Sequence, residues 1–123
     1  MTGKEIIEKL NNALGWELRA INMYAHYSAY VQGIHRLQLS GHFQSEVTES
    51  IGHADTVRAA IVKLDGEAVT NRDSTEIVHT TDYRVMLKEA LKLGKPVVAN
   101  EYSLYSESAQ AKALGDRLCA EVR

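Results

Sequence analysis

Acidic and histidine side chains interrupt three otherwise apolar helical stripes in this 123-residue sequence. The second stripe is apolar in its outer thirds and holds Glu46, Ser50 and His53 in its middle third. The first stripe carries Glu17 and the third carries Glu101. A helix that only packs would not bury such groups unpaired, because removing each from water costs free energy. Carboxylate oxygens and imidazole nitrogens bind iron and similar ions, so this pattern predicts a metal site inside a helical bundle.

Three long helices would position these residues. Apolar residues four and three positions apart predict helices at about residues 4–33, 36–64 and 82–114, followed by a helical stub at 116–123. The few residues between the first two helices favour an antiparallel pair. The polar stretch 67–81 lacks periodicity and could span about 50 Å at about 3.3 Å per residue. It can therefore return along the bundle and place the third helix parallel to the second.

Glycine and proline mark where the predicted helices end or bend. Gly33 suits the left-handed backbone that follows a helix, and the pair Asp65-Gly66 ends the second helix. Gly94 and Pro96 fall inside the third helix, where proline removes a hydrogen bond and clashes with the preceding turn. A kink, or a break into two helices, is expected near Gly94.

The predicted helices bring several polar residues to one height. With the first turn at about residue 35, Glu17 lies 18 residues before it and His53 lies 18 after it, so the two can face each other. Tyr24 and Glu46 each lie 11 residues from the turn. Glu101 is 19 residues into the third helix and His53 is about 17 into the second, which agrees within one turn. Any one of these residues would more simply be a hydrogen-bonded core residue, but together they favour a metal site.

Composition and charge exclude several classes of function. A length of 123 residues with 45% hydrophobic residues suits one soluble domain over 1–123, and a net charge of −2 offers no extended basic surface for nucleic acid. Neither a secretory signal nor a run of about 20 apolar residues is found. A cytoplasmic protein without nucleic-acid or membrane partners is therefore expected. Cys119 is the only cysteine, cannot form an internal disulfide, and is assigned no role.

Two stretches resemble the ferritin-like superfamily, and bacterioferritins most. Residues 10–24, LNNALGWELRAINMY, resemble the first bacterioferritin helix, in which the Glu, here Glu17, is an iron ligand and the Tyr, here Tyr24, lies beside the site. His53-Ala54-Asp55 and the residues up to Gly66 resemble the end of its second helix, where the His is a ligand. The match covers residues 10–66 well and the remainder loosely. It implies an all-α, ferritin-like antiparallel helical bundle with a long crossover between helices two and three, and a fourth helix that is short or missing.

The sequence departs from the bacterioferritin pattern at defined positions. The family's bridging Glu stands three residues before the His, where this chain has Ser50; Glu49 could replace it only if the helix phase or the rotamer adapts. The haem-binding Met falls at Ile51, so no haem is expected. The superfamily repeats the Glu-to-His hairpin, and 36 residues beyond Glu101 is position 137, past Arg123. The second His ligand is therefore outside this chain, which would be a truncated form or a fragment.

The resemblance implies binding and oxidation of Fe(II) with O₂ and iron storage, at a di-iron or mononuclear site that could hold another divalent metal. The expected ligands are Glu17, Glu49, His53 and Glu101, with Tyr24, Glu46 and Ser50 around them. Two alternatives stay open. One is a degenerate, non-catalytic helical assembly module, and the other is a rubrerythrin-like di-iron oxidoreductase, since Tyr102 and Tyr105 lie near Glu101. A homo-oligomer, a dimer or larger, is expected because a short fourth helix would leave an apolar groove.

Overall fold

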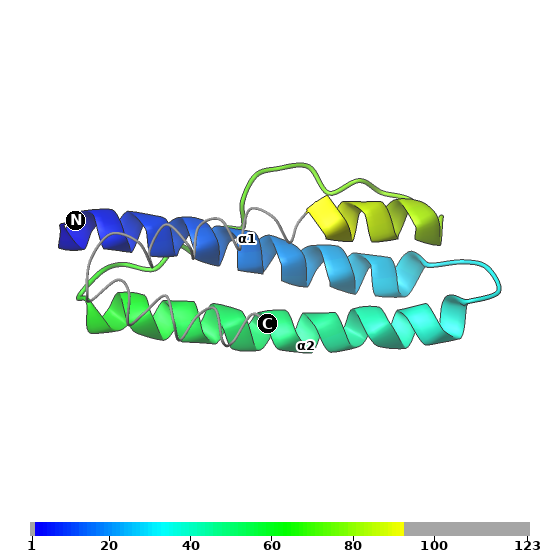
Figure 1. Cartoon of the computed structure of the whole chain (residues 1–123), viewed down its shortest axis with the longest axis horizontal. Helices are drawn as coiled ribbons and strands as arrows, with labels where there is room; N and C mark the ends of the chain where they lie inside the picture. The colour runs from blue at the N-terminus through cyan, green and yellow to red at the C-terminus, as the bar shows by residue number, and fades with distance from the viewer. Residues whose placement is uncertain (1, 93–123) are drawn as a thin grey trace.

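The computed structural model describes residues 2–92 of the chain (Figure 1). Helix α1 spans Gly3–Tyr30 and helix α2 spans Arg36–Lys63. The two run antiparallel, and a further helical segment at 83–92 lies beside α1 and runs parallel to α2 (Figure 1). Residues 2–92 contain no β-strand. The predicted all-α arrangement with a long crossover is therefore confirmed.

Three predictions concern residues beyond the described range. They are the remainder of the third helix to residue 114, the kink or break near Gly94, and the helical stub at 116–123, and all lie outside residues 2–92. The predicted start of the third helix after Thr81 or Asp82 is confirmed, because helical structure begins at residue 83. The Asp82 carboxylate accepts a hydrogen bond from the Arg84 backbone N–H at 2.9 Å, which satisfies a donor of the first turn. Within the described range, no helix is long and apolar enough to cross a membrane.

Helix α1 begins as its sequence indicates and ends earlier than predicted. The Thr2 hydroxyl accepts a hydrogen bond from the Glu5 backbone N–H at 3.2 Å, the expected N-terminal cap. The helix ends at Tyr30 rather than at about residue 33, because Val31 has an extended backbone with ψ 133° and its side chain is buried in the core. Gly33 adopts φ +106° within the turn that follows, where a residue with a Cβ would be strained.

Helix α2 ends at Lys63 in a Schellman motif, which agrees with the predicted end at Lys63 or Leu64. The Gly66 N–H bonds to the Ile61 carbonyl at 2.9 Å, and the Asp65 N–H bonds to the Val62 carbonyl at 3.0 Å. Asp65 holds the left-handed position of this motif with φ 61°. The Asp65-Gly66 pair therefore stops the helix as expected, although Asp rather than Gly occupies the strained position.

Replacing Asp65 by Gly should stabilise the chain by about 1 kcal/mol. Glycine removes the Cβ strain of the left-handed backbone, and loss of the carboxylate removes a negative charge from the negative end of the helix dipole. Asp55→Gly is the matched control, since Asp55 lies exposed inside α2 and glycine there should lower stability by about 0.5 kcal/mol. Urea denaturation of both variants measures the two changes, and a loss of stability in Asp65→Gly would contradict the prediction.

The crossover 67–81 returns along α1 and is fixed to it at intervals. The Asn11 side chain donates to the Glu67 carbonyl and accepts from the Val69 N–H, each at 2.9 Å. One turn further along α1, the Gly15 carbonyl accepts from the Asp73 N–H at 2.9 Å. A Cβ on Gly15 would lie 3.4 Å from that same nitrogen, an ordinary van der Waals distance, so the crossover backbone lies directly on this face of α1.

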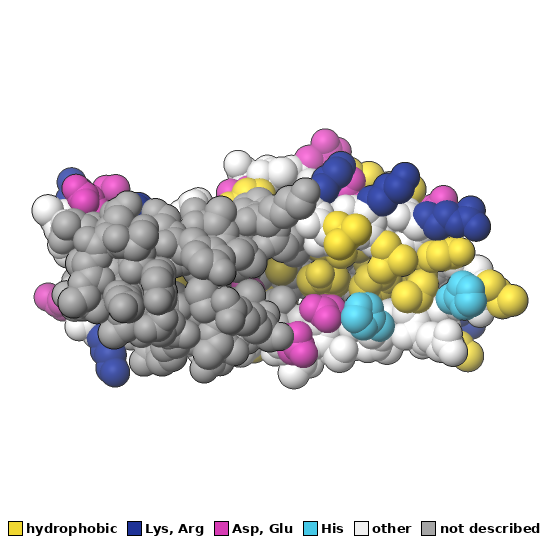
Figure 2. Space-filling view, viewed as in Figure 1, with side chains coloured by type: hydrophobic (Ala, Val, Ile, Leu, Met, Phe, Trp, Pro, Cys, Tyr) yellow, Lys and Arg dark blue, Asp and Glu magenta, His cyan; other side chains and the backbone are white. Residues whose placement is uncertain are grey.

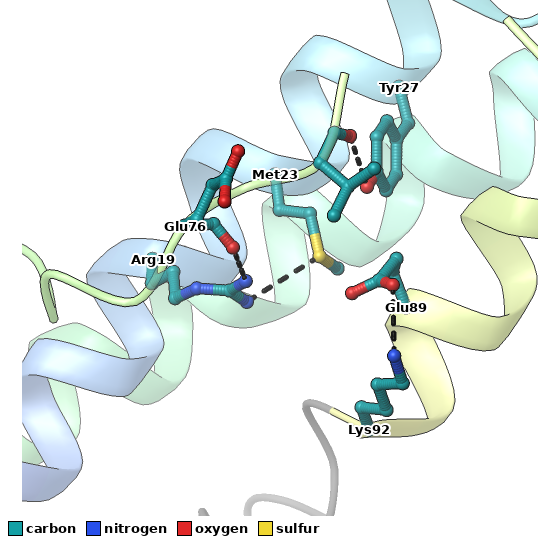
Figure 3. A network of polar contacts seen from close by, with 7 residues as sticks. Arg19, Met23, Tyr27, Glu76, Glu89 and Lys92 are labelled. Atoms are coloured by element: carbon teal, nitrogen blue, oxygen red, sulfur yellow. Dashed lines mark hydrogen bonds and ion pairs between the residues drawn. The ribbon is translucent and has the colours of Figure 1, made fainter. Parts of the chain in front are cut away.

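Arg19 and Tyr27 fix the second half of the crossover (Figure 3). Arg19 is buried, and it donates from Nε to the Thr75 carbonyl at 3.0 Å and from Nη2 to the Glu76 carbonyl at 2.6 Å. The Tyr27 hydroxyl donates to the Val78 carbonyl at 2.8 Å. These bonds satisfy backbone carbonyls that the irregular crossover cannot pair within itself. They explain why a segment without helical periodicity follows a defined path.

Apolar side chains form two separate core clusters along the helix pair. One joins the first half of α1 to the last part of α2, and its buried members are Ile6, Leu10, Leu14, Ala54, Val57, Ala60 and Ile61. The other lies nearer the α1–α2 turn and includes the helical segment 83–92; its buried members are Ala20, Met23, Tyr27, Val31, Phe43 and Met86. The polar residues of the α1 and α2 stripes lie between these two clusters.

Candidate metal centre

Glu17 and His53 face each other between the two apolar clusters. The Glu17 residue is only 4% exposed, and its Oε2 lies 3.6 Å from Nδ1 of His53, whose side chain is also largely buried. Each residue is held by a long helix, Glu17 on α1 and His53 on α2, so their separation is set by the packing of those helices. The prediction that the two residues lie at the same height is confirmed.

Tyr24 lies beside this pair, about two turns nearer the loop. Burial, followed by the negative charges of Glu46, Glu17 and Glu49, raises the pKa of Tyr24 from 10.0 to about 12. Three carboxylates are thus close enough to act electrostatically on one phenol. The Tyr24 ring contacts Phe43, with centroids 6.0 Å apart, which fixes the ring against the second core cluster. The predicted proximity of Tyr24 and Glu46 agrees with the effect of the Glu46 charge on the pKa of Tyr24.

The raised pKa of Tyr24 should make alkaline stability depend on this residue. Because the fold favours the neutral phenol, its contribution is fully present below pH 10.0 and is lost as the pH rises towards about 12. A spectrophotometric titration should show one phenol ionising near pH 12, and Tyr24→Phe should remove it. Tyr30→Phe is the control, since Tyr30 is exposed on α1. An unchanged titration in Tyr24→Phe would show that the carboxylates do not act on this hydroxyl.

The helix phase of α2 places Ser50, and not Glu49, inside the molecule. Ser50 is 5% exposed, whereas Glu49 lies exposed on α2 although its charge still reaches Tyr24. Glu46 is half-buried and lies 3.9 Å from Nε2 of His42. Ile51, where the family has its haem-binding Met, is exposed. Glu49 could join the pair only by a change of rotamer, so its role as a ligand stays a prediction.

Residues 2–92 supply two converging metal donors and not a complete ligand set. No group of three or more His, Cys, Asp or Glu side chains in this range is placed to hold one ion. Donor atoms about 2.1 Å from a shared ion lie roughly 3 to 4 Å apart, and the 3.6 Å between Glu17 Oε2 and His53 Nδ1 falls in that interval. Glu101, the third expected ligand, lies outside the described residues. The donors that are described therefore fit an ion of the oxygen-and-imidazole class.

Two structurally important polar residues were not identified from the sequence. Arg19 is buried and fixes the crossover. Glu89 is largely buried and lies 3.1 Å from Lys92 Nζ (Figure 3). Burial raises the pKa of Tyr27, and the negative charge of Glu89 raises it further. Asn11, Gly15 and Arg19 are spaced four residues apart. Residues four positions apart lie on one face of a helix, and the crossover packs on this face of α1.

The comparison with known proteins agrees with this geometry. The ferritin-like domain model matches residues 7–118. A crystal structure of ferritin-like, diiron-carboxylate proteins from Bacillus anthracis str. Ames superposes with a TM-score of 0.89 at 30% identity, over 99% of this chain and 89% of that chain.

A second solved structure shows the same fold at lower identity. It is a dodecameric thioferritin, the bacterioferritin-related protein from Bacteroides fragilis, with a TM-score of 0.85 at 19% identity, over 99% of this chain and 80% of that chain. No curated protein matches the sequence. Since the family model covers most of the chain, the resemblance noted in the sequence is confirmed, and the chain belongs to the ferritin-like domain family.

Proposed function

We propose that this chain is an iron-binding ferritin-like protein that takes up Fe(II) as its substrate, oxidises it with O₂, and stores the product. The observation that carries the proposal is the pairing of a buried carboxylate and an imidazole, Glu17 and His53, on facing helices. The similar protein from Bacillus anthracis, described as a diiron-carboxylate protein, supports the assignment. In the reaction each Fe(II) gives one electron to O₂.

The proposed roles of the residues follow from their positions. Glu17 Oε2 and His53 Nδ1 bind the ion, and the negative carboxylate offsets part of its charge. Glu101 and Glu49 are the further ligands we propose. Tyr24 remains protonated well above neutral pH, so its hydroxyl can donate a hydrogen bond to a neighbouring carboxylate and orient it. Glu46 adds negative charge beside that hydroxyl.

A non-catalytic assembly module is the second candidate. Ser50 favours it, because a buried hydroxyl stands where the family has a bridging carboxylate. A hydroxyl is a weaker ligand than a carboxylate and cannot neutralise a second cation. In that case Glu17 and His53 would be a buried polar pair without metal chemistry.

Metal loading separates the two candidates. The purified full chain would be incubated without oxygen with Fe(II), and separately with Co(II), then freed of unbound metal and analysed for bound metal. The proposed function requires a stoichiometric amount of bound ion, and in the Fe(II) sample a rise in Fe(III) absorbance when O₂ is admitted. A chain that stays metal-free after both treatments would reject the iron function and support the assembly module.

We propose in addition that the chain forms a homo-oligomer, in the cytoplasm. Large apolar side chains lie exposed near the α1–α2 turn and on the segment 83–92, with Ile34 92% and Leu37 81% exposed and Leu91 also exposed. Figure 2 shows hydrophobic side chains gathered over this part of the molecule, beside a row of Lys and Arg. Exposed apolar surface of this kind is usually covered by a partner. The thioferritin from Bacteroides fragilis is dodecameric, which supports assembly of this chain.

Sedimentation tests the proposed assembly. At micromolar concentration the wild-type chain should sediment as a dimer or a larger species rather than at 13.7 kDa, and the double variant Ile34→Ser, Leu37→Ser should shift towards the monomer. Val62→Ser is the control, because Val62 is an exposed apolar residue near the other end of α2. A wild-type chain that is helical by circular dichroism and sediments as a single 13.7 kDa species would contradict the assembly.

A further inference from the structure

A second polar cluster lies on the opposite side of α1 from Glu17. His26 Nε2 on α1 lies 2.8 Å from His79 Nδ1 on the crossover, and Tyr30 packs against both imidazoles, with ring centroids 4.5 and 4.7 Å away. At about 100° per residue, the nine positions from Glu17 to His26 correspond to about 180° around the helix. The cluster is therefore separate from the candidate metal centre.

The two histidines line an open pocket of about 310 Å³ between α1 and the crossover. Its other lining residues are Asn22, Arg72 and Ile77. Among residues 2–92, every polar side chain of this lining can donate a hydrogen bond, and none is a carboxylate. Such a lining suits a ligand that is negatively charged and accepts several hydrogen bonds. We propose that this pocket binds a tetrahedral oxyanion of the phosphate class.

Arg72 is held in place by the crossover itself. Its Nη1 donates to the Asp73 carbonyl at 2.7 Å and to the Thr75 carbonyl at 3.0 Å, which leaves the donors on Nε and Nη2 for a ligand. Burial raises the pKa of Asp73, but the hydrogen bonds from Thr75 and the charges of Arg19 and Arg72 outweigh it and lower that pKa overall. Two guanidinium groups, those of Arg19 and Arg72, thus act on the one carboxylate of Asp73.

The histidine pair can take up one proton when the anion binds. In the neutral pair, one inner nitrogen donates to the other, so one outer nitrogen carries a hydrogen and the other carries a lone pair. Adding one proton keeps the inner hydrogen bond and makes both outer nitrogens donors. With this proton in place, a phosphate ion can accept a hydrogen bond from each imidazole. The groups around the pair are Asn22, Tyr30 and Arg72, with Asp73 and Arg19 beside Arg72.

A cation is less well matched to the same pocket. Two imidazole nitrogens 2.8 Å apart could bind one transition-metal ion, but the described part of the chain adds no carboxylate to the pocket lining that would complete the ligand set. Arg72 would also repel the ion. Binding of Zn(II) or Ni(II) at this pair is therefore the outcome that the experiment must distinguish from phosphate binding.

The test is a titration of the full chain with inorganic phosphate at constant ionic strength, followed by calorimetry and by the imidazole resonances in NMR. Wild type should show one saturable site and shifts of the His26 and His79 resonances. Arg72→Gln and His79→Gln should each weaken binding about tenfold or more, because each removes a charge-assisted hydrogen bond. Arg72→Lys, which keeps the charge, should retain part of the affinity.

Control variants and a check of folding separate a loss of phosphate binding from a loss of structure. Arg58→Gln and His42→Gln change exposed side chains on α2 and should leave phosphate affinity unchanged. Circular dichroism would establish that each variant is folded, and the NMR titration of wild type needs no variant. Unmoved histidine resonances in wild type, or equal phosphate affinity in Arg72→Gln and wild type, would overturn the proposal. Saturable Zn(II) binding at His26 and His79 without phosphate binding would replace it with a metal site.

Discussion

The Arg19→Ala variant is expected to unfold with a free energy about 3 kcal/mol lower than that of the wild type. Arg19 is buried on α1 and donates to the Thr75 and Glu76 carbonyls and towards Met23 Sδ (Figure 3). Hydrogen bonds from a charged donor contribute about 1.5 to 3 kcal/mol each, and two crossover carbonyls would lose their partner. Alanine would also leave a cavity beside Met23, which belongs to the second core cluster.

The matched control for Arg19→Ala is Arg58→Ala on α2. Arg58 is half-exposed and pairs with Asp55, three residues away, at 2.9 Å. An ion pair of this exposed kind contributes about 0.5 kcal/mol, so the control should unfold almost as the wild type does. Urea denaturation at a fixed chain concentration measures both, because assembly would otherwise change the apparent stability. Equal stability of the two variants would mean that Arg19 does not hold the crossover.

Replacing Arg19 should destabilise the crossover more than it destabilises the rest of the fold. The crossover has few apolar anchors between Thr70 and Glu76, so its path depends on the bonds to Gly15 and Arg19. Hydrogen exchange of amides in this stretch should therefore accelerate more in Arg19→Ala than exchange of amides inside α2. A uniform acceleration across both regions would indicate that only the overall stability had changed.

The periodicity of apolar residues was sufficient to predict α1, α2 and their antiparallel pairing. It also predicted the facing of Glu17 and His53, because two straight helices joined by a short turn have only one register once the turn is located. The end of α1 was predicted three residues too late. Gly33 marked the turn, but the helix stops where Val31 becomes extended to place its side chain in the core, and that choice depends on tertiary packing.

The course of the crossover could not be predicted in the same way. Its hydrogen bonds are made by single polar residues of α1, such as Asn11 and Arg19, to backbone carbonyls that no side-chain pattern identifies. The position of Glu49 was better predicted. The helical stripe read from the sequence holds Ser50 and not Glu49, and the packed structure agrees, with Ser50 buried and Glu49 exposed.

Replacing either Glu17 or His53 by alanine should weaken Co(II) or Fe(II) binding about 100-fold or more, because each change removes a direct ligand, and second-layer changes alone cost 10- to 100-fold. Glu8→Ala on α1 and Asp55→Ala on α2 are the controls, since both remove exposed carboxylates from the same helices. Metal titration followed by Co(II) absorbance measures all four variants. Unaltered affinity in both Glu17→Ala and His53→Ala would reject the assignment of these ligands.

The pair of Glu17 and His53 should have opposite effects on the stability of the metal-free and the metal-bound protein. A buried carboxylate and imidazole are costly to desolvate, so the double variant Glu17→Leu, His53→Leu should be at least as stable as the metal-free wild type. Metal ions should raise the unfolding temperature of the wild type by mass action and leave that of the double variant unchanged. Lower stability of the double variant without metal would mean that Glu17 and His53 serve packing, since a pair that serves to bind an ion has no need to stabilise the empty fold.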